Sequence, residues 1–276
     1  MGVCRDEAPR RIVVVGDFVE IDRDQSFDSA GIAVSASNYP QVFFAPVAHL
    51  PDLITTENSW EIHMTTTLLA NPVELIEEKT RAIIDEVIES LPDPKLLTSE
   101  ERRGIIARYS SVLEGNFIYW MTATAIATKA DQSGPILLDN LYEEVHDCHP
   151  LMMRKFAIAA NAFPTDKDAL AVNDDLTKVR LFLGHLQPVK SVLMMAFFEG
   201  FIQKFMSYLA DLAARQGSTE MEYTDVHGVC DIEHTEGLFR VLAAEIELAS
   251  TEPEEELFEG VTLLRTLIER MIHPVS

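Results

Sequence analysis

Cysteine is scarce in this sequence. Cys4, Cys148 and Cys230 are the three cysteines among 276 residues, and they lie far apart. Small secreted domains that depend on disulfides carry a denser and usually even-numbered set of cysteines. The sequence therefore excludes a disulfide framework and favours a protein of the reducing cytoplasm.

Basic residues are also few. Lys and Arg number 22 against 45 Asp and Glu, which gives a formal net charge of −23 at neutral pH. Nucleic acids and anionic membrane surfaces attract proteins through clusters of positive charge. We therefore expect neither nucleic acid nor a membrane surface as a partner.

Long hydrophobic runs are missing as well. No stretch of about 20 uninterrupted apolar residues, the length that crosses a bilayer, occurs in the chain. The apolar run in "RIVVVGDF", near the amino terminus, is too short for a signal peptide. Apolar residues still make up 47% of the sequence, enough for a packed core. These observations predict a soluble, cytoplasmic globular protein.

The first 56 residues differ from the rest. They are rich in β-branched and aromatic residues, as in "RIVVVGDFVEI" and "QVFFAPVAHL", and prolines interrupt them. This composition predicts an N-terminal arm or short strands that pack on the main body. "VVVGD" resembles the start of a nucleotide-binding unit, but neither a G-x-G-x-x-G motif nor a βαβ repeat follows it.

Residues 57–276 show helical periodicity, and we expect them to form one all-α domain. Thr98 and Glu101 have the spacing of a capping box, Pro150 suits a first helical turn, and Gly217 suits a helix end. The pattern predicts seven or eight helices. The predicted helical stretches are 72–91, 98–130, 134–145, 149–163, 167–185, 187–217, 219–248 and 254–272.

Three metal-ligating residue types share one face of the predicted helix 219–248. His227, Asp231 and His234 lie at positions i, i+4 and i+7, and Leu238 continues the same stripe towards the core. Buried imidazoles and carboxylates without partners would cost several kcal/mol. Because nitrogen and oxygen ligands of this kind suit iron, manganese or zinc, the pattern predicts a metal site.

Two glutamates occupy similar apolar stripes on other predicted helices. Glu199 lies in "SVLMMAFFEGFIQKF", where burial requires protonation, a cation or a metal to neutralise it. Polar groups from another helix could satisfy it instead. Glu114, in "SSVLEGNFIYWM", has serines as well as apolar residues on its face. It suits either a metal ligand or a structural role.

A dense polar cluster, "LYEEVHDCHPLMMRKF", supplies Glu143, Glu144, His146 and His149. Together with the other helices, it completes a set of carboxylates and histidines that could converge on two metal ions. One interpretation resembles the ferritin-like diiron order of Glu, E-x-x-H, Glu, E-x-x-H. That order would use Glu114, Glu143, His146, Glu199, Asp231 and His234, with Asp231 where the pattern normally has Glu.

A second resemblance is closer and covers about residues 98–245. "YTDVHGVCDIEHTEGLF" resembles the H-x3-D-x2-H helix of the heme-oxygenase-like diiron oxidases, "DNLYEEVHDCHPLMMRKF" resembles their second ligand segment, and "AFFEGFIQKF" is similar to their helix with one buried Glu. The family fold is a heme-oxygenase-like helical bundle. The resemblance implies as metal ligands Glu144, His149, Glu199, His227, Asp231 and His234, with Glu114 as an additional carboxylate.

This chain departs from the family in one segment. Many members have a longer, glycine-rich connection between the Glu and the His that correspond to Glu144 and His149. Only four residues separate the two here, so His146 competes as the ligand. We prefer His149 because the following "PLMMRKF" matches the family segment best.

The resemblance implies two Fe(II) ions as cofactor, O2 as co-substrate and a small-molecule amino-acid substrate. The whole chain also resembles members that desaturate isoleucine or valine and close an azetidine ring in antibiotic biosynthesis. An amino-acid carboxylate would need a basic partner, and Arg154, Arg180 and Arg240 lie near the ligand segments. An external electron donor and a homodimer stay open.

Other classes of protein also stay open at the level of sequence. A ferritin-like diiron oxygenase, such as an N-oxygenase, would use His146 as a ligand. A non-enzymatic iron-binding protein would hold the metal without a substrate-dependent product. A thiamin-salvage hydrolase of related fold would need a nucleophilic cysteine, and Cys230 lies beside the ligand stripe without a supporting set of residues.

Overall fold

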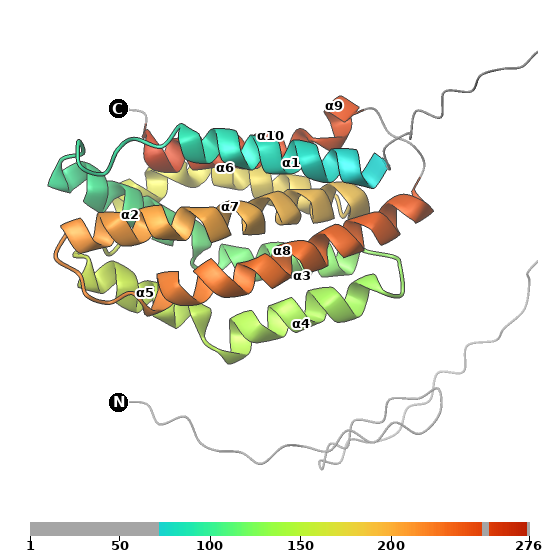
Figure 1. Cartoon of the computed structure of the whole chain (residues 1–276), viewed down its shortest axis with the longest axis horizontal. Helices are drawn as coiled ribbons and strands as arrows, with labels where there is room; N and C mark the ends of the chain where they lie inside the picture. Colours follow the sequence, from blue (N-terminus) through green and yellow to red (C-terminus); the bar gives the residue numbers. More distant parts are fainter. Residues whose placement is uncertain (1–71, 250–253, 275–276) are drawn as a thin grey trace, which may run out of the picture. The chain divides into compact units, whose positions relative to one another are not determined.

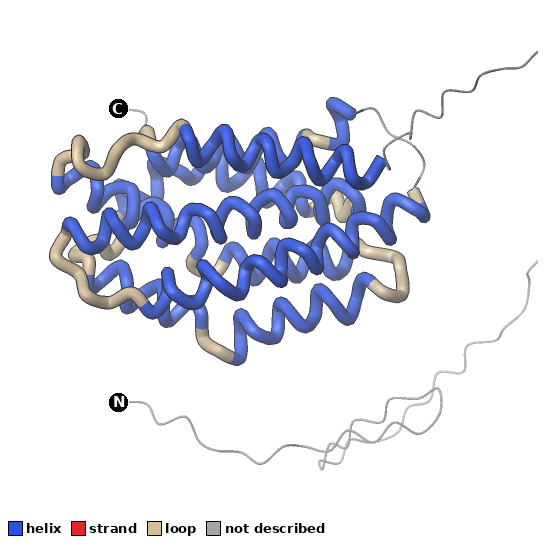
Figure 2. Tube along the Cα trace, viewed as in Figure 1, coloured by secondary structure: helices blue, strands red, loops and turns tan. Residues whose placement is uncertain are grey.

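The computed structural model describes residues 72–249 and 254–274, which form helices and connecting loops without any strand (Figures 1 and 2). All of them belong to the second of the two units into which the chain divides, residues 64–276. The predicted N-terminal arm, residues 1–56, lies outside the described residues. The helices are α1 (Pro72–Glu89), α2 (Ser99–Leu113), α3 (Asn116–Ala127), α4 (Ser133–His146), α5 (His149–Ala159), α6 (Asp166–Leu183), α7 (Pro188–Arg215), α8 (Glu222–Leu248), α9 (Glu254–Leu257) and α10 (Glu259–Ile272).

Helix α7 forms the centre of the bundle. Every residue from 190 to 202 is buried, as expected for a helix that is apolar on all sides. Helix α7 packs along α8 and also contacts α1, α2, α3, α5 and α10. The prediction of an all-α bundle is therefore confirmed for the described part of the chain.

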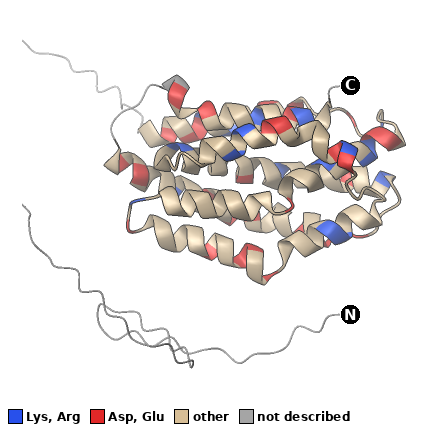
Figure 3. Cartoon of the chain, turned by 180° about the vertical axis from the view of Figure 1, so that it is seen from behind, with Lys and Arg blue, Asp and Glu red and all other residues tan. Residues whose placement is uncertain are grey.

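The length and composition of α7 would also allow it to cross a membrane, and it is the one described helix with this property. However, 78% of its apolar window is buried inside the bundle. Its apolar surface therefore serves the core. Acidic positions are spread along the helices, with basic ones scattered among them (Figure 3).

The stretch 98–130, predicted as one helix, is divided between α2 and α3. The predicted capping box at Thr98 and Glu101 is present at the start of α2. The break falls at Gly115, whose φ of 76° lies in the left-handed region that glycine adopts without strain. Glu114 is the last residue before this break and caps α2. The break thus places the Glu114 side chain at a helix end.

The segment between α4 and α5 also breaks, and the break decides which histidine faces the core. Helix α4 ends at His146, Cys148 adopts a left-handed φ of 59°, and α5 begins at His149 with Pro150 in its first turn. The predicted helix start near Pro150 is confirmed. Because the chain changes direction here, His146 and His149 belong to different helices.

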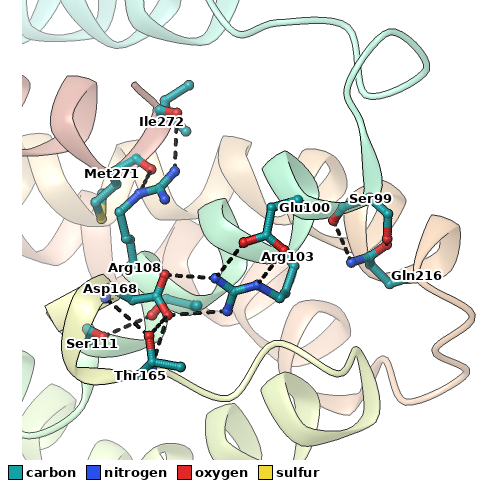
Figure 4. A network of polar contacts seen from close by, with 11 residues as sticks. Ser99, Glu100, Arg103, Arg108, Ser111, Thr165, Asp168, Gln216, Met271 and Ile272 are labelled. Atoms are coloured by element: carbon teal, nitrogen blue, oxygen red, sulfur yellow. Dashed lines mark hydrogen bonds and ion pairs between the residues drawn. The ribbon is translucent and has the colours of Figure 1, made fainter. Parts of the chain in front are cut away.

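A polar network joins α2 to α6 and α10 (Figure 4). Arg103 forms an ion pair of 3.1 Å with Asp168, which belongs to the capping box of α6. The buried Arg108 donates hydrogen bonds to the carbonyls of Met271, at 2.6 Å, and Ile272, at 3.3 Å. These carbonyls are among those that the end of α10 leaves without helical partners. The network therefore ties three helices of the bundle together.

Candidate metal centre

Six of the seven predicted ligands are buried, and they come from four helices. Helix α4 supplies Glu144, α5 supplies His149, α7 supplies Glu199, and α8 supplies the other three. None of the six is more than 9% exposed, although each has a charged or ionisable side chain. The six residues are Glu144, His149, Glu199, His227, Asp231 and His234.

The first group of possible ligands consists of Glu144, His149 and His227, here called the Glu144 cluster. Their nearest ligand atoms all lie within 4.8 Å of one another. The carboxylate Oε1 of Glu144 lies 2.8 Å from His149 Nδ1 and 3.7 Å from His227 Nε2. The two imidazole rings meet edge to face, with centroids 4.5 Å apart. One carboxylate and two imidazoles therefore converge on a single point.

His227 is held in place by its own helix. Its Nδ1 lies 2.8 Å from the main-chain carbonyl of Tyr223, one turn earlier in α8. Because a carbonyl only accepts, Nδ1 must carry the proton, and Nε2 is the nitrogen that faces Glu144. An imidazole fixed through its second nitrogen in this way is the usual arrangement of a metal-ligating histidine.

The Glu144 cluster is electrostatically coupled. Burial raises the pKa of Glu144, but hydrogen bonds and charge interactions with His149 and His227 outweigh burial and lower it to about 2. Burial lowers the pKa of His227, whereas Glu144, Asp231 and the Tyr223 carbonyl raise it, and the net shift is upward. The cluster therefore favours a negative Glu144 carboxylate beside a positively charged imidazole. A metal ion can take the place of that positive charge.

The second group consists of Cys230, Asp231 and His234, here called the Asp231 cluster, whose ligand atoms also lie within 4.8 Å of one another. Asp231 Oδ1 accepts a contact of 3.2 Å from the Cys230 thiol and lies 3.7 Å from His234 Nδ1. Asp231 Oδ2 and His234 Nδ1 are buried without hydrogen-bond partners. Such orphaned atoms are costly. A metal ion fits here because both atoms can donate an electron pair to it.

His234 has a partner on its other nitrogen. Its Nε2 lies 2.9 Å from Glu143 Oε2, and the Glu143 side chain is 44% exposed. Burial lowers the pKa of His234, but Asp231, Glu199 and Glu143 raise it to about 9. Glu143 thus orients His234 so that Nδ1 faces Asp231 and Glu199.

Glu199 lies between the two clusters. Its Oε1 is 4.0 Å from His234 Nδ1, and it lines the same cavity as Glu144. Burial, followed by repulsion from Asp231, raises its pKa well above the ordinary value. The amide of Asn140 donates to Glu199 Oε1 at 3.1 Å. A buried carboxylate in this place suits a cation. Polar groups of another helix satisfy it only in part, through the single hydrogen bond from Asn140.

Glu114 is not brought into either cluster. It lines the cavity that reaches the Glu144 cluster, but its carboxylate forms an ion pair with Arg154 of α5. Its role as a metal ligand stays a prediction. His146 lies on the surface, where it stacks on Tyr142 and contacts Asp147. Of the two competing histidines, the structure therefore brings His149 to the site and leaves His146 outside it.

Three contacts of the site were not assigned from the sequence: Asn140 to Glu199, Glu143 to His234, and the Tyr223 carbonyl to His227. Glu143 belongs to the dense polar segment that the sequence analysis singled out. The carbonyl contact is a main-chain feature, so no side-chain pattern signals it. Asn140 lies one helical turn before Glu144, a spacing that could have indicated a shared face.

Two pockets reach the site from different sides. The first is a narrow pocket, partly open to solvent, that combines apolar walls with Glu144, His149, Glu199 and His227. The second is roomier, lies between α4 and α8 and reaches His234. Acidic and other polar groups line it beside Ile136, Leu137 and Leu238, among them Asp139, Asn140, Glu143, Cys230, Glu233 and Arg240. The two clusters therefore face different surroundings.

The nitrogen and oxygen donors of the two clusters fit iron. A family model described as iron-containing redox enzyme matches residues 107–267, which include all six buried residues and more than half of the chain. No curated protein and no solved structure matches the chain. The helical architecture and the family match confirm the predicted heme-oxygenase-like bundle. The chain belongs to the family of iron-containing redox enzymes.

Proposed function

We propose that the chain is an O2-dependent oxidase that holds two iron ions. The observation that carries this proposal is the convergence of six buried donor side chains from four helices: five of them belong to the two clusters, and the sixth, Glu199, lies near both. Glu144, His149 and His227 would hold one ion, Asp231 and His234 would hold the other, and Glu199 lies where it could serve both. Iron bound there would supply electrons for the reduction of O2.

The chain's own residues would prepare the site in three ways. The Tyr223 carbonyl and the Glu143 carboxylate fix the protonated nitrogens of His227 and His234, so that the other nitrogens face inward. Asn140 holds one oxygen of Glu199. Buried aromatic side chains exclude water around α7, among them Phe117, Trp120, Phe198 and Phe201. A dry, preorganised site limits unwanted reactions of activated oxygen.

We further propose a small aliphatic amino acid as substrate, with removal of two hydrogen atoms as the first outcome. The apolar walls of the first pocket support an aliphatic side chain on this substrate. Reduction of O2 to two water molecules takes four electrons, and desaturation of one substrate molecule supplies two of them. An external electron donor must supply the other two. Closure of an azetidine ring from isoleucine or valine would require a second oxidation of the same kind.

The test is anaerobic addition of Fe(II) to the full chain, followed by exposure to O2 with and without single amino acids. We expect two iron ions per chain. With one aliphatic amino acid, O2 consumption should accelerate, and mass spectrometry should detect a product that lacks two hydrogen atoms.

The controls separate this proposal from its alternatives. Iron-dependent O2 consumption that no amino acid changes would contradict the substrate and indicate an iron-oxidising or iron-storage role. A chain that binds no iron in either cluster would contradict the metal assignment itself. The thiamin-salvage alternative receives no structural support, because Cys230 donates to Asp231 and burial raises the pKa of its thiol.

A further inference from the structure

One of the residues that line the first pocket, Glu114, belongs to a pair of opposite charges that is more exposed than the rest of the site. Glu114 and Arg154 form this ion pair, and their side chains are 32% and 51% exposed. The side chains at the inner end, Glu144, His149 and His227, are at most 6% exposed. The ion pair therefore marks the side of the pocket that solvent and small molecules reach first.

Apolar side chains lie between this pair and the possible metal ligands. Leu113, Phe117, Ile118, Met153 and Ile202 line the pocket together with Glu114. Glu114 sits at the end of α2, directly before the left-handed Gly115, so its carboxylate extends from a helix terminus. Arg154 follows Met153 in α5 and pairs with Glu114, so its guanidinium lies beside the pocket and not among the residues that line it.

We propose that Glu114 and Arg154 form the recognition site for a zwitterionic α-amino acid. Arg154 would bind the α-carboxylate and Glu114 the α-ammonium group, while the aliphatic side chain enters the apolar part of the pocket. This inference rests on the proposed function, because it places the substrate's carbon chain next to the Glu144 cluster. It reassigns Glu114, which the sequence analysis considered as a metal ligand, to the substrate.

The charges favour a zwitterion over simpler acids or amines. A half-exposed ion pair contributes little to stability, so its two charges can exchange one another for the two charges of a ligand at small cost. A carboxylic acid without an ammonium group would satisfy Arg154 but leave Glu114 beside a second negative charge. An amine without a carboxylate would leave Arg154 unpaired.

The other arginines near the site suit this role less well. Arg180 donates to Asn116 at 2.8 Å and lines neither pocket. Arg240 lines the second pocket, but Asp139, Glu143 and Glu233 surround it there with an excess of negative charge.

Anaerobic calorimetry on the full chain tests the proposal without turnover. The probes are L-isoleucine and two analogues that each lack one charge, 3-methylpentanoate and 2-methylbutylamine. Dissociation constants are measured for the Fe(II)-loaded and the metal-free chain. We expect L-isoleucine to bind about tenfold or more tightly than either analogue, since each hydrogen bond to a charged group contributes about that much.

Two substitutions assign the charges. Arg154→Gln should weaken L-isoleucine binding by about 10- to 100-fold and leave the binding of 2-methylbutylamine nearly unchanged. Glu114→Gln should weaken L-isoleucine binding and improve the binding of 3-methylpentanoate. Arg265→Gln is the matched control, because Arg265 pairs with Glu86 in another half-exposed ion pair, outside both pockets. It should leave all three affinities unchanged.

The outcomes separate this inference from the proposed function. Equal binding of L-isoleucine and 3-methylpentanoate, absence of any L-isoleucine binding, or unchanged binding in both pocket variants would overturn the recognition site. Binding with the expected pattern but without substrate-dependent O2 consumption would uphold the site and contradict the oxidase. Turnover of an amino acid with unchanged KM in Arg154→Gln would do the reverse.

Discussion

The Glu144 cluster and the Asp231 cluster contain similar residue types but differ in how their polar atoms are satisfied. In the first, Glu144 contacts both imidazoles, and the pKa of Glu144 falls to about 2. In the second, Asp231 Oδ2 and His234 Nδ1 lack partners. The metal-free protein therefore pairs the charges of the Glu144 cluster but leaves two buried polar atoms of the Asp231 cluster without hydrogen-bond partners. These unpartnered atoms are the stronger indication that a metal ion binds in the Asp231 cluster.

The two clusters also differ in what orients their histidines. A main-chain carbonyl of α8 holds His227, whereas the half-exposed side chain of Glu143 holds His234. The Glu144 cluster opens to the pocket with apolar walls, and His234 opens to the polar pocket between α4 and α8. The contact of His227 is made by the main chain of its own helix, whereas that of His234 depends on a half-exposed side chain. We therefore expect the Asp231 cluster to release its ion more easily.

The largest effect should follow from removing one ligand of each cluster. Asp231→Ala should abolish binding of the ion at the Asp231 cluster, and His227→Ala should abolish binding at the Glu144 cluster. Each variant should then retain one iron ion after anaerobic loading and desalting, and should lose substrate oxidation. Iron analysis and circular dichroism of the same samples measure occupancy and helicity together.

His146→Ala is the matched control for these variants. His146 lies only three residues from His149 in sequence, but it is exposed and stacks on Tyr142. Its removal should leave iron content and helicity unchanged. Full occupancy in both ligand variants, or iron loss in His146→Ala, would contradict the assignment of the two clusters.

The sequence predicted the bundle and most of the buried donors, because both depend on periodicity. The i, i+4, i+7 spacing of His227, Asp231 and His234 needs only a helix to share a face, and α8 is that helix. The choice between His146 and His149 depended on a chain reversal at Cys148, a non-glycine residue with positive φ. No local pattern signals such a turn. The pairing of Glu114 with Arg154 across 40 residues likewise depends on tertiary structure.

The protonation of the metal-free site gives the next largest effect. The pKa of His234 is raised from 6.5 to about 9, so the folded chain holds a proton that the unfolded chain releases above its own pKa. This contribution to stability is fully present below pH 6.5 and is lost as the pH rises through about 9. It amounts to about 3 kcal/mol. Urea denaturation of the metal-free chain across this range should show the decrease.

A bound metal should remove this pH dependence. Metal ligands bind in their deprotonated forms, so saturating Fe(II) under anaerobic conditions displaces the proton of His234. The stability of the loaded chain should then stay level or increase between pH 6.5 and 9. The substitution His234→Gln should flatten the decrease in the metal-free chain. A metal-free chain whose stability rises with pH over this interval would refute the coupling.

A smaller effect should come from Glu143→Gln, which keeps the shape of the side chain but removes its charge. Loss of an outer partner of a ligating histidine typically costs about 10- to 100-fold in metal affinity. We expect this loss for one of the two ions only, measured by competitive Fe(II) chelation. Glu233→Gln is the control, because Glu233 lines the same pocket without contacting His234. Equal losses at both ions would remove the proposed difference between the clusters.

The smallest effect concerns the tyrosine pair behind the Glu144 cluster. The hydroxyls of Tyr109 and Tyr223 lie 3.0 Å apart in the core, and the Tyr223 ring packs on His227 with centroids 4.2 Å apart. Tyr109→Phe leaves the Tyr223 hydroxyl buried without a partner, which should lower the free energy of unfolding by about 1–2 kcal/mol. Substituting both tyrosines by Phe removes the unpaired group and should restore most of that loss. Iron occupancy should stay complete in both variants, because the contact that orients His227 is the main-chain carbonyl of residue 223, which no side-chain substitution removes. Loss of iron from the Glu144 cluster in Tyr109→Phe would show instead that the orientation of His227 depends on the tyrosine hydroxyls.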